Sequence, residues 1–171
     1  MFSKTGIEKY FIAEKNESIL FIIIGVATIV LAVIFFFFIK TNWHKGAAIP
    51  FFIVGIMHLG VGYTVYKLSD AHRQQNVYAY DMNPSALKTK EILRMEKVNT
   101  DFVILRYIEI ILLIFGLGVF FYFKNVETKT FWVGLGFALA IEATLSLGAD
   151  YFAQGRAQTY TNGLKEFTKN L

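Results

Sequence analysis

Long apolar runs alternate with polar stretches along this chain and predict its architecture. Four runs, at residues 18–39, 48–66, 102–123 and 130–151, are each about as long as a helix needs to be to cross a lipid bilayer. Short turns join the first run to the second and the third to the fourth, and one long polar interval, residues 67–101, separates the two pairs. The pattern predicts an all-α integral membrane four-helix bundle made of two helical hairpins.

The polar interval 67–101 keeps a helical spacing of apolar positions on both sides of Asn83-Pro84-Ser85, which is a turn and helix-start signal. We therefore expect a cytoplasmic helical linker, with the second and fourth helices extending beyond the membrane. Residues 6–16 predict a separate short amphipathic helix on the membrane surface. No polar segment is long enough for a soluble domain, so residues 1–171 form one membrane domain.

Composition supports lipid as the main solvent of this chain. Hydrophobic residues make up 55% and aromatic residues 17% of the sequence, and the mean hydropathy is +0.47. An average soluble domain is roughly 45–50% apolar. The sequence has no cysteine, which excludes disulfides, thiol nucleophiles and Cys-ligated zinc or iron–sulfur clusters.

The basic residues predict the orientation in the membrane. Residues 1–16 contain three Lys, residues 67–101 contain six Lys or Arg and residues 152–171 contain three, against four in the two short turns. The positive-inside rule then places both termini in the cytoplasm, and we expect the inner (plasma) membrane of a bacterium. The net charge of +4 fits lipid headgroups, not nucleic acid, because these residues flank the apolar runs. The first residues lack the features of a cleaved signal peptide.

The two halves of the chain resemble one another. An offset of 84 superposes Phe36, Phe37 and Lys40 on Phe120, Phe121 and Lys124. An offset of 80 superposes Thr64, Asp70 and Gln74 on Thr144, Asp150 and Gln154. This similarity predicts a parallel 2+2 repeat, although apolar segments also align by chance.

Four polar side chains fall at membrane depth. Glu109 and Glu142 lie roughly 12 Å, and His58 roughly 13 Å, from the cytoplasmic ends of their spans at 1.5 Å per residue. Arg106 lies one turn nearer the cytoplasm than Glu109, at a spacing that permits an ion pair. An ionised side chain at the membrane centre costs at least about 2.5–3.5 kcal/mol, so these residues should face inward and form one polar layer.

Three interpretations of this layer remain open. Arg106 could bridge Glu109 and Glu142 in a purely structural network. The layer could instead form an ion or proton path, in which Glu142 exchanges protons and His58 acts as a relay. The third interpretation is a site for a ligand or a protein partner.

Small residues also recur in the spans, where they allow helices to approach closely. In the fourth run they occupy every fourth position, at Gly136, Ala140, Thr144 and Gly148. Gly55, Gly60 and Gly62 interrupt the second run. They can pack within the chain or form the seam of a dimer.

No catalytic set is recognisable, so we predict that the chain is not an enzyme and needs neither cofactor nor metal. Ser146 and His58 lack a third group and an oxyanion element. There are no paired membrane Asp residues, no zinc-binding His/Glu set, no phosphate-binding Gly-rich loop and no lysine within a span.

The leading prediction is a non-enzymatic membrane protein that acts through protein contacts, as an accessory subunit or an immunity-type protein. Its cytoplasmic docking surface would include Arg73, Gln74, Lys88, Arg94 and Arg156. The alternative is a small oligomeric ion channel or proton-coupled transporter that uses the Glu/Arg/His layer.

Overall fold

The computed structural model describes residues 2–170, and this part of the chain is almost entirely helical, without strands. Helix α1 (Lys4–Val33) continues as the π-helix η1 (Ile34–Ile39) and is followed by α2 (Asn42–Met82). Short elements α3 (Pro84–Ala86) and η2 (Leu87–Glu91) lead into α4 (Ile92–Phe123). The 3₁₀ turn η3 (Glu127–Lys129) precedes α5 (Thr130–Phe167), and η4 (Thr168–Asn170) follows it. Four helical segments are long and apolar enough to span a membrane, as the sequence predicts.

Local capping explains where the helices begin and end. The Ser3 hydroxyl accepts a hydrogen bond from the Gly6 N–H, and the Thr41 hydroxyl accepts one from the His44 N–H, so both residues act as N-caps. Lys40 ends η1 with a left-handed backbone, φ 59°. The break after α2 falls at Asn83, and Pro84 occupies the first position of the next helix, where its missing N–H costs little.

The amphipathic helix expected on the membrane surface does not exist as a separate element. Residues 6–16 are the first turns of α1, which runs unbroken into the first apolar run. Ile7 and Phe11 are fully buried in an apolar cluster with Leu87, Met95 and Leu164. The apolar face of this segment therefore packs against α4 and α5, and no Pro or Gly interrupts the helix after Gly6 until Gly25.

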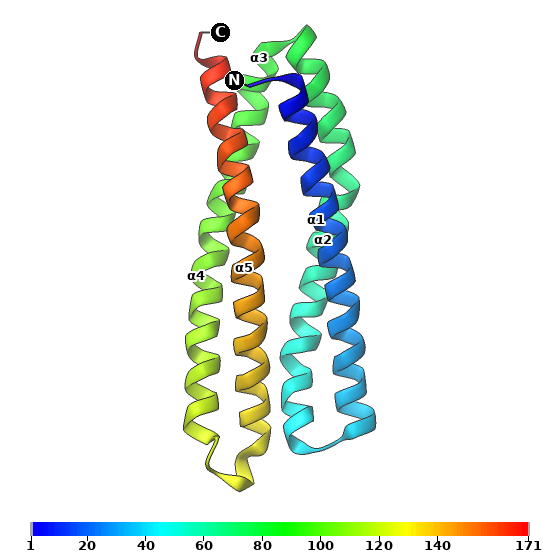
Figure 1. The fold of residues 1–171 in the computed structure, drawn as a ribbon, viewed down its shortest axis with the longest axis vertical. Coiled ribbons are helices and arrows are strands. Elements are labelled where there is room, and N and C mark those ends of the chain that lie inside the picture. The colour runs from blue at the N-terminus through cyan, green and yellow to red at the C-terminus, as the bar shows by residue number, and fades with distance from the viewer. Residues whose placement is uncertain (1, 171) are drawn as a thin grey trace.

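Neighbouring helices run side by side along the bundle (Figure 1). Helix α1 packs along α2, α4 packs along α5, and α2 joins the two pairs by packing against α5. Both termini and the α2–α3 connection lie at one end, and the two short turns lie at the other (Figure 1). One apolar cluster fills the terminal end, and a second, around Ala47, Phe51 and Ala138, lies near the turns.

Glycine pairs bring the backbones together at three helix–helix contacts. Gly25 meets Gly55 between α1 and α2, and Gly116 meets Gly136 between α4 and α5. Between α2 and α5, Gly46 faces the backbone of Phe131 and Gly134 faces that of Trp43.

The third contact is the closest, because a Cβ on Gly46 would lie 1.9 Å from the Phe131 carbonyl oxygen. The recurring small residues therefore lie in two different environments. Gly55 and Gly136 pack within the chain, whereas Gly60 and Gly148 face open space.

Candidate functional site

An elongated cavity of about 510 Å³ lies between the four long helices. It runs from the level of Tyr10 and Arg94, outside the predicted spans, to the level of Val54 and Leu112 within them. Most of its wall is apolar. The titratable side chains that line it come from all four long helices, and besides Tyr10 they are Glu14, Glu17, His58, His72, Arg94, Asp101, Glu109, Glu142, Asp150 and Arg156.

Three of the four residues of the predicted polar layer line this cavity. His58 comes from α2, Glu109 from α4 and Glu142 from α5. Glu142 is 1% exposed and Glu109 9%, whereas His58 is half-buried. They share one cavity but do not form the single layer predicted, because Glu109 lies beside Asp150, eight residues or about 12 Å along α5 from Glu142.

Several polar atoms of this group have no hydrogen-bond partner within residues 2–170. They are both carboxylate oxygens of Glu142, Oε2 of Glu109 and Nδ1 of His58. Buried polar side-chain atoms are paired in the large majority of cases. A purely structural network would provide hydrogen-bond partners for these atoms, so their lack of partners favours a binding site.

Arg106 does not take part in the layer as the structural interpretation requires. Its guanidinium donates a hydrogen bond to Oε1 of Gln154 on α5, and no ion pair joins it to Glu109 or Glu142 in the described part of the chain. The side chain is exposed on the outside of the bundle. A long arginine one turn from the end of a span can extend along the helix toward the interface, and this geometry leaves the two glutamates unbridged.

Two further α5 residues belong to the site. Asp150 lines the cavity, and its carboxyl group lies beside that of Glu109. The sequence marks Asp150 only as the end of a span. Ser146 lies with its Oγ 3.4 Å from Nε2 of His58, a meeting that spacing along the chain does not predict. The other ring nitrogen of His58 is unpartnered, so this contact lacks the third group that orients the base of a catalytic dyad.

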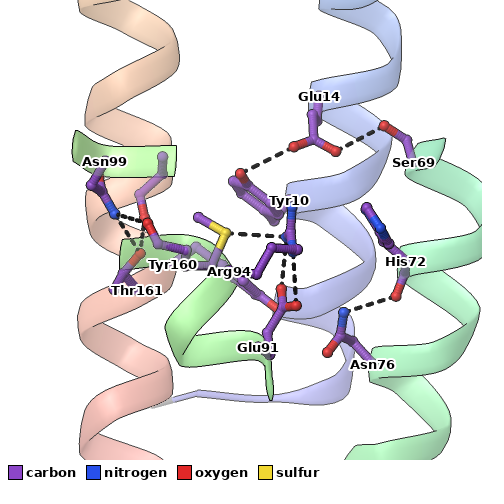
Figure 2. Close-up of polar contacts among 12 residues, drawn as sticks. Tyr10, Glu14, Ser69, His72, Asn76, Glu91, Arg94, Asn99, Tyr160 and Thr161 are labelled. Atoms are coloured by element: carbon purple, nitrogen blue, oxygen red, sulfur yellow. Dashed lines mark hydrogen bonds and ion pairs between the residues drawn. The ribbon is translucent and has the colours of Figure 1, made fainter. Parts of the chain in front are cut away.

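A polar network lies at the end of the cavity nearest the chain termini (Figure 2). Arg94 donates two hydrogen bonds to Glu91, from Nε at 2.9 Å and from Nη2 at 2.7 Å, and Tyr160 donates one to the same carboxylate at 3.2 Å. Glu91 and Tyr160 are almost fully buried. This charge-assisted pair fixes the start of α4 against α5.

The same network continues onto α1 and α2 (Figure 2). The Tyr10 ring stacks on Tyr160 with centroids 4.2 Å apart, and its hydroxyl donates to Glu14, which also accepts from Ser69. Burial raises the pKa of both tyrosines, so their hydroxyls remain donors. The sequence interpretation missed this network. It assigned residues 6–16 to the membrane surface, and the only signal for the network in the sequence was the spacing of polar side chains along the predicted helices.

The residues predicted for cytoplasmic docking occupy different environments. Gln74 and Lys88 are exposed, and Arg73 is half-buried and paired with Asp70. Arg94 lies inside the network described above. Arg156 forms an ion pair with Glu17 of α1 and lines the cavity.

Within residues 2–170, no group of three or more His, Asp or Glu side chains is arranged to hold a metal ion. No family model matches this chain, and no curated protein or solved structure is significantly similar to it. What this site binds therefore has to be inferred from the positions, burial and charges of its own residues.

Proposed function

We propose that this chain crosses a membrane four times. Large apolar side chains stand exposed around all four spans, with Ile23 59%, Phe38 76% and Ile114 65% exposed. A contiguous apolar surface of this extent is incompatible with water but matches the hydrocarbon core of a bilayer. Helices that satisfy their own backbone hydrogen bonds are one of the two structures that can cross it.

In the orientation that we propose, both termini and the Asn83 connection lie in the cytoplasm of a bacterial cell, at the inner membrane. This end carries most of the Lys and Arg residues. The short turns at the opposite end would face the periplasm. The long helices then extend beyond the bilayer only on the cytoplasmic side, since α2 alone, at 41 residues, is about 60 Å long.

We propose further that the cavity binds a proton or a small cation and that the protein is a proton-coupled carrier. The observation that carries this proposal is Glu142, a fully buried carboxyl group with both oxygens unpartnered, which lines a cavity shared with Glu109 and His58. A titratable group with this environment is typical of proton and ion sites in membranes. The apolar clusters at the two ends of the bundle favour a carrier over an open pore.

Liposomes with an internal pH dye test this function. We compare the wild type with Glu142→Gln, which keeps the size of the side chain but cannot exchange a proton, and with Glu127→Gln, an exposed position in the turn before α5. The expected result is proton or cation flux in the wild type and in Glu127→Gln, and loss of at least about tenfold in Glu142→Gln. Absence of flux in the wild type, or equal flux in a folded Glu142→Gln, would refute carrier function.

A second candidate function is contact with a protein partner, as an accessory subunit or an immunity-type protein. The observation that favours it lies outside the spans, where Tyr78, Met82 and Leu93 are 64%, 68% and 63% exposed. Large apolar side chains exposed to cytoplasm mark interaction surfaces. Chemical cross-linking in native membranes should capture a partner that Leu93→Ser loses and Leu145→Ser, a lipid-facing change, retains. Identical cross-linked products in all three proteins would argue against this surface.

A further inference from the structure

A groove of about 960 Å³ lies on the outside of the bundle between α1 and α5. The two helices face one another there, at the end of the molecule that holds the termini (Figure 1). Arg106 and Tyr151 line the groove at the level where the third and fourth apolar runs begin and end, whereas Lys9 and Gly163 line it farther out. In the membrane orientation proposed above, the groove starts at the bilayer surface and opens to the cytoplasm.

The groove carries an excess of positive charge. Its charged side chains are Lys9, Arg106, Arg156 and Glu166. Arg156 is neutralised by Glu17, but the ion pairs found within residues 2–170 include neither Lys9 nor Arg106. Two cations therefore face the groove without a bound carboxylate.

Of the two cations, Arg106 has the greater need for an anionic partner. It lies about 6 Å inside the predicted span that begins at residue 102, and its hydrogen-bond partner Gln154 is a neutral, buried amide. The carboxyl groups of Glu109 and Asp150 are nearby but line the internal cavity on the other side. A guanidinium at this depth needs an anion, and the long arginine side chain can extend toward the lipid phosphates at the bilayer surface.

Exposed aromatic side chains border the groove on the membrane side. Tyr151 and Phe152 are 67% and 68% exposed and line it, and Leu145, one and a half turns deeper on α5, is 59% exposed. Aromatic rings at this level are characteristic of the membrane interface. The groove thus combines cations with an apolar wall that leads into the bilayer, which is the chemistry of an amphiphile with an anionic headgroup.

We propose that this groove binds one anionic phospholipid, with its phosphate held by Arg106 and Lys9 and its acyl chains extending past Tyr151 and Phe152. The proposal rests on the membrane insertion proposed above and is independent of cation binding in the cavity. A lipid in this position would bridge α1 to α4 and α5 on a side of the bundle where α1 and α5 have few direct contacts.

Native mass spectrometry of the full chain, released from micelles containing equal amounts of phosphatidylglycerol and phosphatidylcholine, tests this site. We expect one retained phosphatidylglycerol, favoured over phosphatidylcholine, and about tenfold weaker retention in Arg106→Gln. Lys9→Gln should weaken retention less, and Arg106→Lys should restore part of it. Lys124→Gln, which removes a cation at the opposite end of α4, should leave retention unchanged.

Three results would overturn the proposal. Equal retention of the two lipids would show that the headgroup charge is not recognised, and unchanged retention in Arg106→Gln would place the lipid elsewhere. Displacement of the lipid by millimolar inorganic phosphate would indicate a site for a free anion. Extraction of the protein from membranes by alkaline carbonate would separately refute membrane insertion, whereas loss of flux in the carrier experiment has no bearing on lipid retention.

Discussion

Glu91 holds Arg94 through two hydrogen bonds, of 2.7 and 2.9 Å, at the point where α4 begins. The carboxylate is almost fully buried and also accepts a hydrogen bond from Tyr160, so the pair links α4 to α5 at the end of the cavity nearest the termini. Partners this well enclosed depend on each other, because removing one leaves the other charge without compensation.

We predict that Glu91→Gln lowers the free energy of unfolding by about 2–3 kcal/mol. The matched control is Glu96→Gln, which breaks the ion pair between Glu96 and Lys165. The side chains of these two residues are 48% and 49% exposed, respectively. That change should cost less than about 1 kcal/mol. Thermal unfolding in one detergent compares the two variants, and equal losses would contradict the structural role given to Glu91.

Glycine at position 134 is predicted to be essential for joining the two helix pairs. A Cβ there would lie 1.9 Å from the Trp43 carbonyl oxygen, so Gly134→Ala must push α5 away from α2 and should cost about 3 kcal/mol or more. Gly148→Ala in the same helix meets open space and should be neutral or stabilising by up to about 1 kcal/mol. Denaturant titration distinguishes them, and similar values would show that the contact is looser than described.

The stability of the end of the bundle that holds the termini should depend on pH through His72. Burial, with a further contribution from Arg94, lowers the pKa of this histidine below its usual value of 6.5, although Glu91 and Glu14 oppose the shift. The unfolded chain therefore binds the proton more readily, and stability falls as the pH drops below about 6.5. His72→Gln should flatten the change in melting temperature between about pH 5 and 8. An unaltered pH profile would exclude His72 as its source.

Engineered cysteines can establish the orientation, since the natural chain has none. Glu127→Cys lies in an exposed turn and Lys88→Cys lies in the exposed connection at the other end. A membrane-impermeant maleimide added to intact cells should label Glu127→Cys and reach Lys88→Cys only after permeabilisation. The reverse pattern would show that the topology is opposite to the one proposed. Labelling of both cysteines in intact cells would contradict the proposed four-span arrangement.

The four long apolar helices and the position of the break at Asn83 could be predicted because they depend on local properties. Apolar runs of sufficient length demand helices, and Pro84 cannot continue one. Counting residues did not give the relative levels of Glu109 and Glu142, because Glu109 lies beside Asp150, eight residues or about 12 Å along α5 from Glu142.

The sequence could not reveal which way each side chain points. Arg106 is one turn from Glu109, and only the rotation of α4 against α5 decides that it meets Gln154 on the outside. The same holds for Glu91, which resembles any charged residue of the polar linker until Tyr160 and Arg94 are brought to it. Residues 6–16 were misassigned because their apolar face fits lipid and protein equally well, and only the arrangement of α4 and α5 shows the protein partner.

The contact of Gly46 with α5 places the tightest junction between the two helix pairs at one extreme of the molecule. Such a junction is a natural pivot for rotation of one helix pair against the other. Rotating one pair by about 5° around it displaces the far end of a helix about 60 Å long by about 5 Å, without bending either pair. The cavity lies between this pivot and the polar network near the termini, where the Tyr10–Tyr160 stack joins α1 to α5 and so limits how far the two pairs separate.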